Sequence, residues 1–221
     1  MMKRLLVILL LLFPVLSRAQ EGQVRLYIKG GNNSAWGNFA AFSAECSYSL
    51  KKYFSIEGGL QYGTSGAIAT EIRPSYFHDF DKGRLHGELL LHYNPYGSIH
   101  NVAAGVGAGF TARYVFARLG YYYRVFASGK DSFCEPFNIY YELGVSCLPK
   151  IPRWDLRVSV SNCRHFELER HYQPALYIEG WWYPVSSVGI SVGAAYKPSG
   201  MFHLSSDYYQ FYGSIGACYR W

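Results

Sequence analysis

The chain has 221 residues, of which 18% are aromatic and only 16% charged, and its mean hydropathy is −0.04. This aromatic-rich, charge-poor composition is unusual for a soluble domain, while the hydropathy excludes a bundle of transmembrane helices. Of the 21 Lys and Arg, three lie in a predicted signal peptide, and the remaining 18 against 15 Asp and Glu leave too little positive charge for nucleic-acid binding.

Residues 1–19 have the pattern of a secretory signal peptide. Lys3 and Arg4 form a positive region, residues 5–16 are apolar, and Ser17-Arg18-Ala19 has small residues where signal peptidase reads the chain. An apolar core of about a dozen residues is too short for a transmembrane helix. We expect cleavage after Ala19 and a single mature domain over residues 20–221; the alternative is an uncleaved membrane anchor.

The mature chain shows period-two alternation of apolar and polar residues, which predicts β-strands. Twelve such segments are expected, over residues 24–29, 36–49, 54–62, 68–76, 84–93, 102–110, 114–125, 137–146, 154–161, 175–183, 188–197 and 207–221. Pro74 predicts a bulge or a strand end. Ten strands is the alternative, if the first segment and one weak neighbour are misread.

The segments between these strands differ in length in a regular way. Short periplasmic turns are expected at 50–53, 79–83, 111–113, 149–152 and 184–187, whereas longer outer loops are expected at 127–136, 162–171 and 198–206. Residues 30–34 also have turn composition. Alternating short and long connections are typical of an up-and-down barrel with short periplasmic turns and longer outer loops.

The charged residues of the predicted strands all share the parity opposite to the apolar residues. Those in the strand interiors are Glu45, Glu57, Glu71, Arg73, Glu88, Arg118, Arg124, Glu142, Arg157, Glu179 and Lys197. A charge facing lipid at the bilayer midplane costs about 2–4 kcal/mol, so this sorting predicts one lipid-facing and one lumen-facing surface.

The last strand ends on an aromatic residue. Phe211, Tyr219 and Trp221 share its apolar face. This stretch resembles the closing strand of a Gram-negative outer-membrane β-barrel, where a C-terminal aromatic forms the assembly signal. The resemblance implies an all-β, transmembrane, antiparallel up-and-down barrel in the cell outer membrane. Outer-membrane lipid and the barrel-assembly machinery are the implied partners, and we expect a monomer.

Two predicted strands have nearly bare lumen faces. Gly105, Gly107 and Gly109 lie on one, and Gly189 and Gly193 on the other. We expect an off-centre slot beside these strips, with Arg118 and Arg124 giving it a weak anion preference; the alternative is that large side chains pack over the glycines. The other expected lumen-lining residues are Glu57, Glu88, Glu142, Arg157 and Glu179.

Three functions are compatible with such a barrel. The first is a narrow passive channel or small-solute binder without catalysis, and the second is a structural or adhesive barrel that presents its outer loops. The third is a lipid hydrolase, because His203 and Ser205 resemble the His-x-Ser pair of outer-membrane phospholipases and lipid A deacylases. Ser206 stands where those families have Asn, and Asp207 is the one carboxylate near enough to orient the His, which argues against catalysis.

The five Cys and the His residues predict no metal site and no cofactor. No Cys spacing fits a metal, and Cys134 and Cys163, both in candidate outer loops, are the pair that could form a disulfide. His86 and His92 lie six residues apart on one strand face, or about 20 Å, too far to share an ion. We interpret both as lumen partners of Glu88.

Overall fold

The computed structural model describes residues 21–34, 37–51, 53–64, 68–129, 131–147, 151–164, 168, 173–198 and 208–221. The predicted signal peptide, His203 and Ser205 lie outside these residues. No helix among the described residues is long and apolar enough to cross a membrane.

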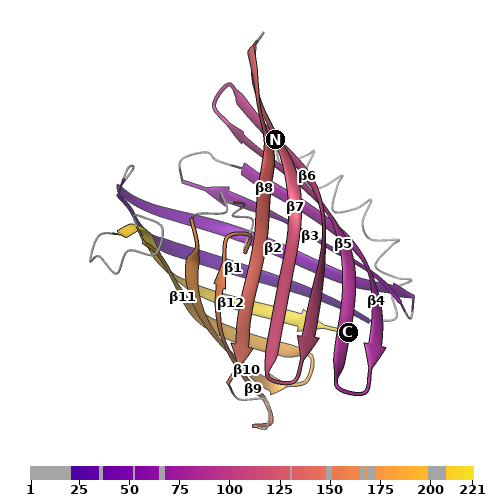
Figure 1. Ribbon diagram of the computed structural model, residues 1–221. Helices are drawn as coiled ribbons and strands as arrows, with labels where there is room; N and C mark the ends of the chain where they lie inside the picture. The colour runs from indigo at the N-terminus through magenta and orange to yellow at the C-terminus, as the bar shows by residue number, and fades with distance from the viewer. Residues whose placement is uncertain are drawn as a thin grey trace.

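The described residues form one closed antiparallel barrel of twelve strands (Figure 1). The strands are β1 Glu21–Asn33, β2 Gly37–Lys51, β3 Phe54–Gly63, β4 Ile68–Phe80, β5 Gly83–Tyr96, β6 Ile99–Ala112, β7 Val115–Ser128, β8 Asp131–Ser146, β9 Trp154–Ser161, β10 Ala175–Val185, β11 Val188–Pro198 and β12 Tyr208–Arg220. Each strand pairs with its neighbours in sequence, and β1 pairs with β12. The expected twelve-strand barrel is therefore confirmed, and the ten-strand alternative is wrong.

The final residue takes part in closing the barrel. The backbone N–H of Trp221 donates to the carbonyl of Gly22, and the N–H of Gly22 donates to the carbonyl of Trp221, each over 3.1 Å. Phe211 and Tyr219 face outward on the same side of β12, and the Trp221 ring packs against Tyr48 and Tyr219. The three aromatic residues thus anchor the last strand on the outer surface of the barrel.

The predicted alternation sets the inner and outer faces of the strands. On β5, Leu89 and Leu91 are about half exposed on the outside, while Leu90 between them is completely buried inside. The same alternation exposes large apolar side chains on the outside of every strand, which gives the barrel an apolar outer surface. Every strand charge predicted to face inward makes its contacts inside the barrel.

Three local expectations were wrong, because the strands concerned are longer or more regular than predicted. Residues 30–33 continue β1 instead of forming a turn, because they pair with both β2 and β12. The expected loop 127–136 is mostly the extended end of the β7–β8 hairpin. Pro74 neither ends β4 nor shifts its register, since the pairs Ile72–Leu91 and Ser75–Glu88 on either side of it share one register with β5.

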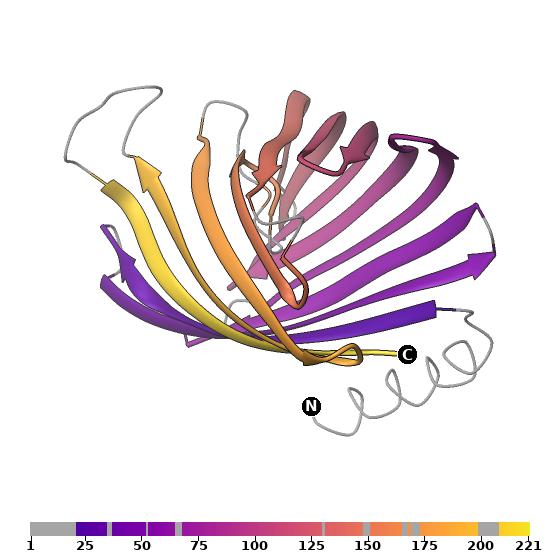
Figure 2. The same ribbon diagram turned by 90° about the horizontal axis from the view of Figure 1, so that it is seen from below.

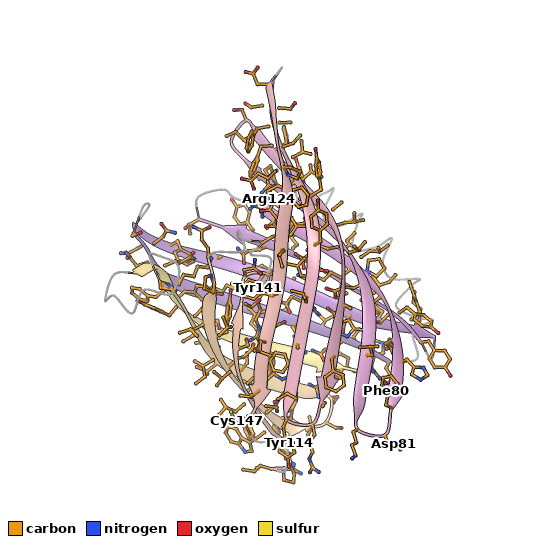
Figure 3. All side chains as sticks on the ribbon, viewed as in Figure 1. Phe80, Asp81, Tyr114, Arg124, Tyr141 and Cys147 are labelled. Atoms are coloured by element: carbon orange, nitrogen blue, oxygen red, sulfur yellow. The ribbon has the colours of Figure 1, made fainter. Side chains whose placement is uncertain are left out.

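The two ends of the barrel differ. We call the end where β1 begins and β12 finishes the terminal end, and the opposite one the loop end. Phe80, Asp81, Tyr114 and Cys147 lie together at the terminal end, and Arg124 lies far from them (Figure 3). Seen from below, the strands form a wide ring around the lumen (Figure 2). Long side chains from the strands fill much of that space.

Candidate functional site

A cavity of about 520 Å³ occupies the terminal half of the lumen. We call it the vestibule. Its wall is formed by residues near the terminal ends of β1 to β9, and its polar lining includes Gln23, Arg25, Glu45, Ser47, Ser55, Glu57, Arg84, Arg113, Arg118, Glu142 and Arg157. Residues deeper along the strands, among them Glu71, Arg73 and Arg164, line it as well, so the vestibule extends toward the middle of the barrel.

The side of the vestibule formed by β3, β5, β7 and β8 is organised around Arg118. Its guanidinium lies 3.8 Å from Glu57, 3.3 Å from Glu88 and 3.9 Å from Glu142, measured between the closest nitrogen and oxygen atoms. Glu88 is buried and Glu142 is partly buried, whereas half of the Glu57 side chain is exposed to the vestibule. One cation therefore offsets charge on three separate strands, β3, β5 and β8, and fixes the inner wall.

A second cluster lies on β4 and β5. The Arg73 Nε lies 2.5 Å from Glu71, its Nη1 lies 3.9 Å from Glu88, and the His92 Nδ1 lies 3.3 Å from Glu71. All four groups are buried. Because buried ionised groups persist only when they are paired, this cluster is a fixed part of the lumen.

The chain turns inward after β9. We call residues Asn162, Cys163 and Arg164 the inner segment. Asn162 extends the edge of β8, since its backbone N–H donates to the Tyr141 carbonyl, its side-chain amide donates to the Ile139 carbonyl and its Oδ1 accepts from the Tyr141 N–H. β9 itself pairs with β8 only up to Ser161, opposite Glu142. The expected outer loop 162–171 therefore begins inside the barrel, which corrects the sequence interpretation.

Arg164 ties the inner segment to the barrel wall. Its Nη2 lies 2.5 Å from a carboxylate oxygen of Glu179 on β10, its Nε lies 3.8 Å from Glu142 on β8, and its Nη1 donates to Ser159 on β9. The guanidinium also lies over the Tyr177 ring. Three consecutive strands thus hold one side chain that lies at the inner limit of the vestibule.

The inner segment meets the opposite wall at Arg73. The Arg73 Nη2 donates to the Cys163 carbonyl over 2.9 Å, although β4 and β9 lie five strands apart in the barrel. Cys163 packs in a buried cluster with Leu90, Ala103, Tyr122, Tyr140 and Leu168. Nearer the loop end, Arg124 donates to the Leu168 carbonyl and lies 3.8 Å from Glu135. Side chains and the inner segment therefore cross the middle of the lumen.

Among the described residues, there is no slot beside the two glycine strips. The Tyr140 hydroxyl lies where a Cβ at Gly107 would point, and the Gly109 and Gly105 positions are covered by His86 and Tyr122. On β11, Gly189 faces Tyr183 and Cys218, and Gly193 faces Ser214. Large side chains thus pack over the β6 glycines and Gly189, as in the alternative interpretation, and a small one, Ser214, packs over Gly193. None of these glycines lines the vestibule.

The vestibule gathers part of the predicted residue set. Glu57, Arg118, Glu142 and Arg157 line it. Glu88 and Glu179 lie behind the lining, as partners of Arg118 and Arg164. Arg124 lies outside it, so the expected role of Arg124 beside an anion slot is wrong.

Sequence reasoning missed Arg25, Cys163 and Arg164 as lumen residues. Arg25 follows the inward parity of β1, lies 3.9 Å from Glu45 and stacks over Trp181. Cys163 and Arg164 were assigned to an outer loop because they follow the last alternating residue of β9. The one signal in the sequence was that Cys163 keeps the inward parity of Arg157, Ser159 and Ser161.

The cysteines and histidines partly follow expectation. Cys134 and Cys163 do not form the disulfide that was considered, since one is exposed and the other buried, and all five thiols are free. His86 Nε2 lies 3.7 Å from Glu88, as interpreted, whereas His92 contacts Glu71 instead.

Solved structures share this architecture at low sequence identity. The NanC porin matches with a TM-score of 0.57 and 11% identity, covering 88% of this chain and 98% of that one. The KdgM porin in complex with disordered oligogalacturonate matches with a TM-score of 0.56 and 10% identity, over 89% and 98%. The outer membrane protein Omp33 of Acinetobacter baumannii matches with a TM-score of 0.51 and 8% identity, over 92% and 99%. No family model and no curated sequence matches the chain.

These likenesses concern the fold. This chain is a twelve-stranded β-barrel of the outer-membrane type, with an apolar outer surface and a polar interior. Short turns face the periplasm in outer-membrane barrels, so we expect the terminal end, and with it the vestibule, to face the periplasm.

Proposed function

We propose that the protein is a non-enzymatic outer-membrane barrel that passes small solutes through a narrow lumen, with a weak preference for anions. The observation that carries this proposal is the polar vestibule, which leads from the periplasmic end toward the middle of the barrel. Its volume of about 520 Å³ leaves room for many water molecules. That space suits hydrated ions and small metabolites rather than folded or polymeric cargo.

The charge of the vestibule supports the weak anion preference. Its lining includes seven Arg and four Glu. Two rim arginines are neutralised by neighbours outside the lining, because Arg84 pairs with Asp79 and Arg157 pairs with Asp155. Arg113 is exposed at the rim and has no ion pair among the described residues. The excess positive charge is therefore small, and it lies near the periplasmic mouth.

The fold supports solute passage, because porins share it. NanC and KdgM are porins, and KdgM was solved with a disordered oligogalacturonate. For this chain we propose monomeric insertion by the barrel-assembly machinery, contact with outer-membrane lipid and no nucleic-acid partner. A twelve-stranded barrel has little spare interior, because wide aqueous channels need about 16 strands or more.

Solute flux into proteoliposomes tests the proposal. Wild-type barrels should admit a size series of small solutes, and small anions faster than cations of equal size. Ser47→Phe narrows the vestibule and should lower the flux at least twofold, whereas Ala44→Phe, on the outer face of the same strand, should leave it unchanged. Arg113→Glu should shift the preference toward cations.

Two results would count against the channel. If wild-type protein, shown to be inserted, admits no solute above empty liposomes, a closed barrel that presents its outer loops remains as the alternative function. If flux occurs but Ser47→Phe and Ala44→Phe behave alike, solutes do not pass through the vestibule.

A further inference from the structure

The lumen is crossed at one point where two distant walls meet. Arg73 on β4 donates to the Cys163 carbonyl of the inner segment, which follows β9. The vestibule reaches both residues, so this contact lies at its inner limit. A solute that moves from the vestibule toward the loop end therefore meets this contact.

The inner segment is held in place differently from the strand side chains that fill the lumen. Side chains such as Tyr27, Trp181 and Tyr183 pack against one another from strands whose backbones are locked in the sheet. Cys163 and Arg164 lie beyond the last paired residue of β9 and are tied down through side-chain contacts. Among these, the polar contacts of Arg164 with Glu179, Glu142 and Ser159 join the segment to three strands.

These polar contacts border water. Arg164 and Glu142 both line the vestibule. A buried apolar contact is lost at full cost when a segment moves, whereas a charged group beside water can exchange its partner for solvent or for another ion. The hydrogen bonds of Asn162 to β8 fix the first residue of the segment, so the ion pairs of Arg164 are the attachment that is easiest to release.

We propose that Cys163 and Arg164 form a gate that is hinged at Asn162 on the edge of β8. The ion pairs of Arg164 with Glu142 and Glu179 hold this gate closed against Arg73, and loss of these ion pairs opens the vestibule toward the loop end. The gate rests on the proposed channel function. Its movement, however, is measurable without any solute, because the gate carries its own thiol.

Cys163 reports the position of the gate, and Cys218 provides a matched control. Both thiols are buried in the lumen, with exposures of 2% and 5%. Cys218 lies on β12, in the cluster of Tyr27, Trp181 and Tyr183, and does not belong to the gate. Opening the gate exposes Cys163 alone, whereas a general loosening of the barrel exposes both thiols.

The experiment measures the rates at which a small, negatively charged methanethiosulfonate reagent labels each thiol of the refolded full-length protein, followed by peptide mass spectrometry. Arg164→Gln should raise the Cys163 rate at least about tenfold, because breaking a buried ion pair weakens the closed state strongly. The Cys218 rate should not change, and Arg164→Lys should keep the Cys163 rate near that of wild type. Glu179→Gln removes the partner in place of the arginine and should act in the same direction, which covers the case that Arg164→Gln does not refold.

Three outcomes would overturn the gate. In the first, the Cys163 labelling rate stays at the wild-type value in both Arg164→Gln and Glu179→Gln. In the second, the labelling rates of Cys163 and Cys218 rise together. In the third, Arg164→Lys gives the same Cys163 labelling rate as Arg164→Gln. Selective labelling of Cys163 without solute flux in any variant would refute the proposed channel but leave the movement of the segment established.

Discussion

The glycine strip on β6 yields a quantitative prediction from the packing inside the barrel. A Cβ added at Gly107 would overlap the Tyr140 hydroxyl and lie 2.8 Å from the Leu119 carbonyl oxygen. Overpacking of this kind costs about 1–3 kcal/mol. Replacing Gly by Ala in a strand also returns about 0.5–1 kcal/mol of backbone entropy. The net expectation for Gly107→Ala is therefore a destabilisation of about 1–2 kcal/mol.

Gly213→Ala is the matched control. Gly213 lies on the outer face of β12, and the nearest atom to an added Cβ, the Gly193 carbonyl oxygen, is 3.9 Å away. This variant should be neutral or slightly stabilising. The assay is a urea titration of folding into lipid vesicles, followed by tryptophan fluorescence. Equal unfolding midpoints for the two variants would refute the packing of Tyr140 over Gly107 and would restore the slot beside the glycines.

Three further predictions concern the membrane face, the closing strand and catalysis. Leu89→Arg places a charge on the outer surface and should lower the free energy of unfolding by about 2–4 kcal/mol near the midplane. Ser47→Arg, inside the vestibule, should lower it far less in the same titration. Similar losses for the two variants would mean that the outer face does not meet lipid. Trp221→Asp should prevent assembly, because the outer aromatic contacts of the last strand are lost, and normal heat-modifiable migration of this variant on gels would contradict that role. Purified protein should release no fatty acid from phospholipid or lipid A; release that depends on Ser205 would replace the channel by the hydrolase.

The architecture was predictable because membrane barrels impose a rule on every residue. A strand that separates lipid from a polar lumen has to alternate, and the alternation around Leu89 and Leu91 placed both on the outside. The strand number followed from counting such segments. Strand ends were less predictable, since the end of β1 and the hairpin of β7 and β8 extend through residues with turn propensity. The end of β1 pairs with two strands and the hairpin strands pair with each other, and this pairing outweighs local preference.

The site was less predictable because parity tells which way a side chain points but not what it meets. Leu90 and Gly107 both lie on inward-facing positions. Leu90 packs in a buried cluster, and Gly107 lies beneath Tyr140, although a bare strip of glycines suggested open space. Arg164 follows β9 in a charged stretch typical of an outer loop. Its inward path depends on Glu142, Glu179 and Arg73, which come from three other strands, and no local pattern encodes that meeting.

Single-channel recording in a planar bilayer tests the central claim most directly. Wild-type protein should give small conductance steps with brief openings and a reversal potential displaced weakly toward anions, and Arg164→Gln should lengthen the openings. If neither protein, once shown to be inserted, produces steps above the bare bilayer, the barrel is not a channel.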